Sequence, residues 1–126
     1  KGLYTPVVAV QTGGHVHIYG SGRTSRLPDG SLAGHGDMRA QLRLTCENVG
    51  KALEAVGATF AEVVRTNTYA TDLDEYFRCS DERADFFKEP LPTSTAVQVS
   101  RLAMPGMLIE IEVEAIIEPG RLRVQG

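Results

Sequence analysis

The segment from Ile109 to Glu118 alternates apolar and acidic residues with a period of two. Its odd-numbered positions are apolar, and its even-numbered positions are glutamates except at Ile116. Because successive side chains of a β-strand point to opposite faces, this pattern predicts a strand with an apolar face and an acidic face. The chain is therefore expected to fold around a sheet whose apolar face is covered.

Four further segments are predicted to be strands. Residues 7–10 and 16–19 are rich in valine and isoleucine and are joined through a Gly-Gly pair, which favours a hairpin because both turn positions tolerate positive φ. Glu62 to Thr71 has the valine, threonine and tyrosine content of a strand. The stretch after Pro92 supplies another strand, whose parity puts Val97 and Val99 on one face.

Two helices are predicted. The first begins at Asp37, an N-cap residue, and keeps apolar spacings of three and four as far as Gly57, a typical C-terminal stop. The second begins at Asp72, which is followed by an acid three residues on, and its helical spacing continues until Pro90. Residues 21–36 are rich in Gly, Ser and Pro and are predicted to be a loop with at most one short strand.

These elements indicate an α+β fold. Two helices can cover only one face of a mixed sheet of five or six strands, so the other face needs water or a partner. The chain has 126 residues, of which 42% are hydrophobic, and this suits one compact domain over residues 1–126.

The composition of the chain limits the classes of binding partner and the cellular location that we expect. A net charge of -3, with no run of Lys or Arg and no Trp, argues against binding to nucleic acid or to a membrane surface. No apolar run approaches the roughly 18 residues of a membrane span and no signal-peptide pattern begins the chain, so we expect a cytoplasmic protein unless Lys1 results from trimming. Cys46 and Cys79 lack metal-type spacing and are expected to be reduced thiols.

The residues from Pro92 to Leu102, followed by those from Leu108 to Ala115, resemble the closing pair of strands in the RidA family (YjgF/YER057c/UK114) of enamine/imine deaminases. Further matching segments occur in the same order along the chain: Ser21-Gly22, Asp37 to Gln41, Glu47-Asn48-Val49, Asp72-Leu73 and Phe86-Phe87. The resemblance implies a chorismate-mutase-like fold and hydrolase activity without a cofactor. It also implies a homotrimer with three small-molecule clefts at the subunit interfaces.

The same resemblance suggests site residues. Glu114 matches a family glutamate that helps to position or protonate the substrate. Ser94 stands where active members carry an arginine that grips the substrate carboxylate, so the chain is interpreted as a divergent relative. Ser80 stands where active members often carry Asn, and Ala96 stands where many carry Cys. Val8 stands where the family's cleft has a tyrosine from the N-terminal part of the chain.

Hydrolysis of an enamine or imine requires a proton at carbon or nitrogen, a water aimed at the electrophilic carbon and a donor for the substrate acid. Glu114 is the acid–base candidate, although the same pattern is typical of an ordinary glutamate on a solvated strand face. If the acidic face is enclosed, crowding of its three carboxylates should raise the pKa of at least one of them.

A serine at position 94 cannot replace a guanidinium, which binds a carboxylate at two points and stays charged. Arg23, just after the Ser21-Gly22 turn, is the better replacement, ahead of Arg26. Alternatively, Arg23 is an ordinary surface arginine in a polar loop. Arg101 has the opposite parity to Ser94 on the same strand and is expected to be structural.

The other polar candidates are interpreted as hydrogen-bond donors. Ser80, Ser94 and Thr95 show no nucleophile–base spacing and are expected to line the cleft with the Ser21-Gly22 backbone. His15 and His17 alternate on one strand face, but they lack a third ligand nearby, so an exposed pair is favoured over a metal site.

The sequence supports one leading hypothesis and two alternatives. The leading hypothesis is a RidA-family hydrolase that deaminates an enamine, an imine or a related unsaturated amine. A non-catalytic, metabolite-binding or regulatory protein is the first alternative, and the serine at position 94 favours it. The endoribonuclease activity attached to some family members fits poorly with an acidic chain that has no basic groove.

Overall fold

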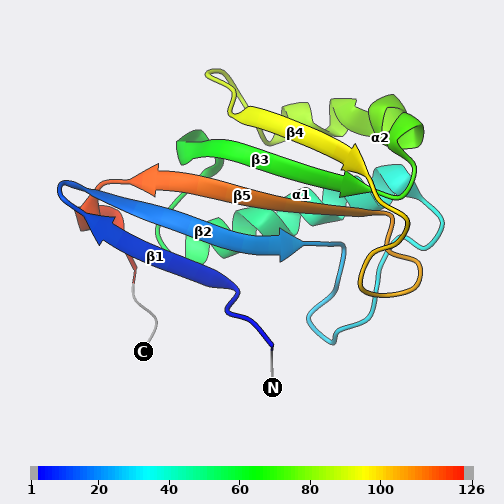
Figure 1. Ribbon diagram of the computed structural model, residues 1–126, viewed down its shortest axis with the longest axis horizontal. Coiled ribbons are helices and arrows are strands. Elements are labelled where there is room, and N and C mark those ends of the chain that lie inside the picture. Colours follow the sequence, from blue (N-terminus) through cyan, green and yellow to red (C-terminus); the bar gives the residue numbers. More distant parts are fainter. Residues whose placement is uncertain (1–2, 124–126) are drawn as a thin grey trace.

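Figure 1 shows the computed structural model of the chain, in which residues 3–123 are described. Five strands form one mixed sheet, and α1 and α2 lie against one of its faces. The strands are β1 Val7–Thr12, β2 His15–Arg23, β3 Val63–Ala70, β4 Thr93–Gln98 and β5 Ile109–Ile117, and the helices are α1 Met38–Ala55 and α2 Leu73–Cys79. Short 3₁₀ helices are Phe60–Glu62, Ser80–Asp85 and Pro119–Arg121. The predicted α+β arrangement is confirmed, with five strands.

The strand β5 occupies the centre of the sheet, whose order is β1-β2-β5-β3-β4. It pairs antiparallel with β2, where Ala115 faces Ile18, and antiparallel with β3, where Val113 faces Thr66. At the edges, β1 is antiparallel to β2 and β4 is parallel to β3. The strand with the clearest alternation in the sequence therefore joins the N-terminal hairpin to the rest of the sheet.

The core lies between the apolar face of the sheet and α1. Ile109, Ile111 and Ala115 of β5 are fully buried, and Leu42 and Leu53 of α1 belong to the same cluster. The glutamates of β5 alternate with these residues and are only half-buried. Burial of the predicted apolar face thus sets which side of the sheet the helices cover.

The boundaries of α1 agree with the prediction. The Asp37 carboxylate accepts the backbone N–H of Ala40 at 3.0 Å, which satisfies one unpaired donor of the first turn. Gly57 follows the helix with a φ of 90°, a conformation that favours glycine.

The second helix is shorter than predicted. Regular α-helix stops at Cys79 instead of continuing towards Pro90, and residues 80–85 form 3₁₀ turns. The Ser80 hydroxyl donates to the carbonyl of Phe77 at 2.9 Å, a local bond that competes with regular helix. Apolar spacing could not reveal the change, because periods of 3.0 and 3.6 residues differ little over two turns.

The second strand is longer than predicted. It continues beyond Tyr19 to Arg23, with a register shift against β5 between Gly20 and Arg23. The polar loop begins only after this point and contains one isolated bridge, between Arg26 and Leu32. The Ser-Gly-Arg segment is therefore held beside the first residues of β5.

Both cysteines are buried and neither forms a disulfide, as predicted. Burial raises the pKa of Cys46 to about 12, which keeps this group a thiol. Within residues 3–123, no helix has the length and apolar character required to cross a bilayer.

Candidate functional site

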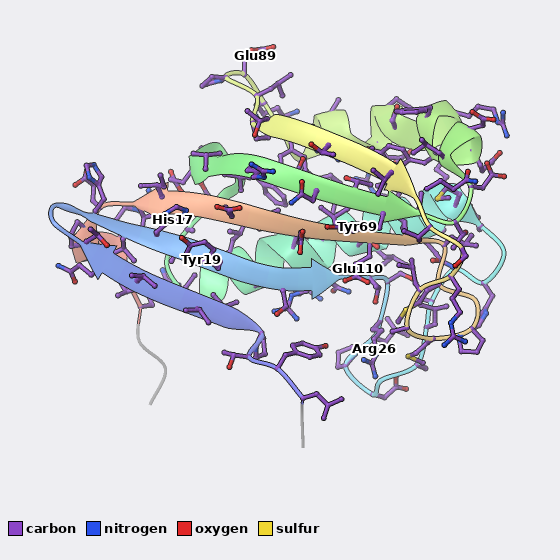
Figure 2. The ribbon with its side chains drawn as sticks, viewed as in Figure 1. His17, Tyr19, Arg26, Tyr69, Glu89 and Glu110 are labelled. Carbon is purple, nitrogen blue, oxygen red and sulfur yellow. The ribbon has the colours of Figure 1, made fainter. Side chains whose placement is uncertain are left out.

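The sheet face opposite the helices carries the acidic side chains of β5. Glu110, Glu112 and Glu114 are half-buried on this face. Figure 2 labels Glu110 of β5 and, from the adjoining strands, His17 and Tyr19 of β2 and Tyr69 of β3. Although the three glutamates come from one strand, their surroundings differ, and each has a different chemical character.

Glu114 lies between two basic side chains. Its Oε1 is 3.3 Å from His17 Nε2, and its Oε2 is 3.9 Å from Arg65 Nε. His17 stacks on Tyr19 with ring centroids 4.4 Å apart, which fixes the imidazole ring against the sheet. The Glu114 side chain is one-third exposed, so a ligand on this face can contact it.

Glu112 is bound by two side chains of β3. Its Oε1 accepts Asn67 Nδ2 at 3.0 Å and the Tyr69 hydroxyl at 2.7 Å. The bond to this carboxylate raises the pKa of Tyr69, because the phenol proton would be lost beside a negative charge. Glu112 is therefore an acceptor with a fixed orientation.

Glu110 packs against the backbone of β2. Its carboxylate lies over Gly22, so closely that a Cβ at that position would overlap it. Burial, followed by the charge of Glu112, raises the pKa of Glu110. The raised pKa expected for one of these carboxylates is found at Glu110, where burial is a larger cause than the charge of Glu112.

A cavity of about 850 Å³ opens between the end of β2, the following loop, α1 and β5. Ser21, Gly22 and Arg23 line it, together with Glu110 and Glu112. The Nε of Arg23 is buried and has no hydrogen-bond partner within the described residues. An unpaired buried donor of this kind is costly, and it belongs to a cationic side chain that lines the cavity.

A second depression of about 300 Å³ lies next to this cavity on the open sheet face. Its lining includes Glu114, Arg65 and Tyr19, and it shares Ser21 and Glu112 with the larger cavity. The Ser21 hydroxyl donates to the carbonyl of Thr5 at 2.7 Å, so it holds the N-terminal segment in place. Glu114 and the Ser-Gly-Arg segment therefore border one continuous polar region.

Ser94 lies on the other face of the sheet. It pairs with Thr66 in the parallel ladder, whereas Thr95 pairs with Asn67 on the open face. Since Glu114 is paired with Arg65, strand alternation places Ser94 and Glu114 on opposite faces of one chain. A site that contains both residues requires two copies of the chain.

The remaining candidates are dispersed. Ser80 ends α2 and its hydroxyl binds the Phe77 carbonyl, away from both depressions on the sheet. His15 is exposed and His17 contacts Glu114. The part of the chain that the structure describes has no group of three His, Cys, Asp or Glu side chains placed to hold a metal ion.

The sequence analysis did not identify the side chains that contact the three glutamates of β5. The alternation marked the acidic face, but it gave no reason to separate Glu110 from Glu114. Asn67 and Tyr69 share the parity of this face on β3, so period-two analysis of that strand could have found them. The contact of Glu110 with Gly22 depends on the register shift in β2, which carries no obvious sequence signal.

Solved structures of small Rid proteins share this fold. RidA from an Antarctic Psychrobacter species aligns with a TM-score of 0.77 and 31% identity, over 92% of this chain and 89% of that chain. A protein of unknown function of the conserved Rid family from Yersinia pestis aligns with a TM-score of 0.79 and 32% identity, over 93% and 90% of the two chains. The molecule is thus a Rid-type α+β protein.

The family described as Endoribonuclease L-PSP matches residues 2–117, and the chain belongs to this family of RidA-like proteins. A human 2-iminobutanoate/2-iminopropanoate deaminase is 30% identical over 102 residues, which cover 81% of this chain and 74% of the human protein. A RutC family protein from Pyrococcus horikoshii is 36% identical over 83 residues, 66% of this chain and 65% of that protein.

Proposed function

We propose that the protein is a RidA-type hydrolase that deaminates the enamine or imine of a small carboxylic acid, in clefts between the subunits of a homotrimer. The observation that carries the proposal is the placement of Glu114 in a polar depression next to the Ser-Gly-Arg segment. The names of the human, rat and bovine relatives as imine deaminases support it. We also propose a cytoplasmic location.

In the proposed reaction, water adds to the carbon of a protonated imine, the carbon–nitrogen bond breaks, and a carbonyl product and ammonia leave. Glu114 positions the water or transfers the proton, with its carboxylate oriented by His17 and Arg65. No cofactor is required, since both the nucleophile and the proton come from water.

The donors are proposed to come from two copies of the chain. The Ser21-Gly22 backbone and Arg23 of one copy take the acid group, because the buried Nε of Arg23 lacks a partner. Ser94 and Thr95 belong to the edge strand, where their exposed hydroxyls can approach a neighbouring copy. Ser80 is the least supported donor, because its hydroxyl already binds Phe77.

Substitution of Glu114 tests this proposal. We expect Glu114→Gln to abolish deamination, since the amide cannot exchange a proton with the substrate. Glu118→Gln changes an exposed glutamate just beyond β5 and should leave activity intact. A steady-state assay with 2-iminopropionate compares the two, and full activity of Glu114→Gln would contradict the role of this residue.

The serine at position 94 predicts a weak enzyme. Loss of a bidentate ion pair to the substrate acid costs about 1.5–3 kcal/mol, so we expect turnover of 2-iminopropionate roughly 10- to 100-fold below that of an arginine-bearing relative. In that case Ser94→Arg should raise the activity, and Glu114→Gln in the same background should remove it. An inactive but correctly assembled Ser94→Arg trimer would exclude a simple vestigial deaminase site.

A non-catalytic, metabolite-binding protein is the second candidate, and the single weak donor at Ser94 favours it. Such a protein would bind a small acid in the same cleft and turn over none of the imines tested. RNA is a poor substrate for this chain, because the open face that would have to meet phosphates carries three glutamates.

A further inference from the structure

Three basic side chains border the larger cavity. Arg23 comes from the end of β2, Arg26 from the loop that follows, and Lys51 from α1. Within residues 3–123, none of the three forms a salt bridge. Three positive charges without acidic partners on one cavity favour the entry of an anion.

Asn48 brings two of these cations to the same wall. Its Nδ2 donates to the backbone carbonyls of Thr24 and Arg26, each at 2.8 Å, and so ties the loop to α1. Lys51 lies three residues further along α1, on the same side of the helix as Asn48. Arg26, labelled in Figure 2, and Lys51 therefore border the same part of the cavity.

Most donors of the Arg26 guanidinium are available. Its Nε makes a long bond of 3.4 Å to the carbonyl of Gly30. Neither Nη atom has a hydrogen-bond partner in the part of the chain that the structure describes. A guanidinium presents five N–H donors and a lysine three, so this wall can bind several ligand oxygens.

The two acids of the cavity do not neutralise these cations. The carboxylate of Glu112 is bound by Asn67 and Tyr69, and that of Glu110 lies over Gly22. Neither glutamate forms a salt bridge with a described residue. The positive charge on the opposite wall is therefore left for a ligand.

The cavity is also large for a small imino acid. Its volume of about 850 Å³ lies in the range of roughly 300–1,000 Å³ that is typical of sites for drug-sized ligands. The imine of a three-carbon acid would fill only a small part of this space. Ala52 of α1 and Met107, which precedes β5, add apolar surface to the wall, and such surface suits the methylene groups of a longer substrate.

We propose that the substrate carries a second carboxylate, which Arg26 and Lys51 bind while Arg23 takes the acid beside the imine. The protein then acts on the imine or enamine of a dicarboxylic acid. A carboxylate suits the cavity better than a phosphate, because Glu110 and Glu112 repel a doubly charged group. This substrate class deepens the proposed deaminase function and rests on it for the reacting group.

Binding of two acids is measured without turnover, by NMR on the complete ¹⁵N-labelled protein. Glutarate has two carboxylates, and its monoamide has the same length with one charge fewer. We expect glutarate to bind about tenfold more tightly, because charge-assisted hydrogen bonds are lost with the second charge. The backbone amides of Gly22 and Lys51 report the site, and added sodium chloride should reduce the preference.

Variants identify the residues that bind the second acid. We expect Arg26→Gln and Lys51→Gln each to lower the ratio of the two affinities by about threefold or more. Lys88→Gln removes a positive charge that does not border the cavity, and it should keep the wild-type ratio. Lys51 is exposed and glutamine is a good helix former, so Lys51→Gln should fold normally. The two-dimensional spectrum of each variant shows whether it is folded.

Turnover then tests the substrate class. An amino-acid oxidase produces the imines of glutamate and of glutamine in the assay, and these differ only in the second acid. We expect kcat/KM to be about tenfold higher for the glutamate imine, mainly through KM, because the second acid binds alike in the ground state and the transition state. Arg26→Gln and Lys51→Gln should lower this ratio.

Two results would overturn the dicarboxylate proposal. One is equal binding of glutarate and its monoamide by wild type, and the other is a preference that survives in both Arg26→Gln and Lys51→Gln. If wild type deaminates 2-iminopropionate but shows no preference for glutarate, the proposed function stands and the second acid is excluded. If wild type prefers glutarate, with dependence on both cations, but deaminates no imine, the site for two acids stands and the deaminase is excluded.

Discussion

At the scale of single residues, the three glutamates of β5 show how one repeated pattern gives different chemistry. Glu114 lies between His17 and Arg65, Glu112 accepts two hydrogen bonds, and Glu110 is desolvated over Gly22. Only the packing of neighbouring strands distinguishes them. At Glu110, burial followed by the charge of Glu112 raises the pKa of the carboxyl group.

The raised pKa of Glu110 predicts a pH dependence of stability. The folded protein holds this proton more tightly than the unfolded chain, whose glutamates titrate near a pKa of about 4.3, so the free energy of unfolding falls as the pH rises through the raised value. Glu110→Gln removes this contribution. We expect the variant to gain stability relative to wild type as the pH increases from 4 to 8.

Urea denaturation at several pH values measures this difference. Glu118→Gln, which changes an exposed glutamate near the same end of the chain, supplies the baseline. A Glu110→Gln curve parallel to that of wild type over the whole range would show that Glu110 titrates alike in the folded and unfolded states.

At the scale of elements, the sequence predicted the hairpin, α1, β3 and β5 because each has a local signal: a Gly-Gly turn, an Asp cap with a glycine stop, a strand-type composition and strict alternation, respectively. The end of α2, where the Ser80 hydroxyl binds a backbone carbonyl, and the extension of β2, which contains a register shift, have no periodic signal in the sequence and could not be predicted. The site was predicted in part for the same reason. Ser21, Gly22 and Arg23 share one segment, whereas their contact with Glu110 depends on strand pairing.

Gln41 connects α1 to the loops at one end of the sheet. It is fully buried, and its Nε2 donates to the carbonyls of Gly34 and Gly106 at 3.2 and 2.9 Å. Its Oε1 accepts the backbone N–H of Leu108 at 2.9 Å. This side chain thus holds the start of β5, and with it the wall of the larger cavity.

We expect Gln41→Met to lower the free energy of unfolding by about 2 to 4 kcal/mol, because three backbone groups lose their partners. Thr45, one turn further along α1, is the matched control. Its hydroxyl is buried without a partner within the described residues, so Thr45→Val should change stability by less than about 1 kcal/mol or increase it. Chemical denaturation monitored by circular dichroism compares the two, and equal losses would contradict the role of Gln41.

At the scale of the whole molecule, the open sheet face combines carboxylates with exposed apolar residues. Val8, Val10, Tyr19 and Ile116 are 38–45% exposed, and the strand registers put them all on the face opposite the helices. Such a surface is typical of a contact between subunits. It agrees with the proposed homotrimer.

We expect the protein to sediment at three times the monomer mass of 13.7 kDa. We expect Ile116→Lys to dissociate the trimer, because burying an unpaired ammonium in a symmetric interface is costly. Phe77→Lys also places a lysine at an exposed apolar position, but on α2, and should remain assembled. Sedimentation velocity at micromolar concentration decides between these outcomes. A stable wild-type monomer would remove the interface cleft and, with it, the proposed mechanism.

The central place of β5 has a consequence for synthesis on the ribosome. Because β2 and β3 each pair with β5 and not with each other, the hairpin and the helical half share no hydrogen-bond ladder until residues 109–117 have emerged. A nascent chain that pauses earlier exposes two strand edges that could pair with other chains. Translation speed over the last quarter of this sequence should therefore affect the yield of folded protein more than its speed over the first.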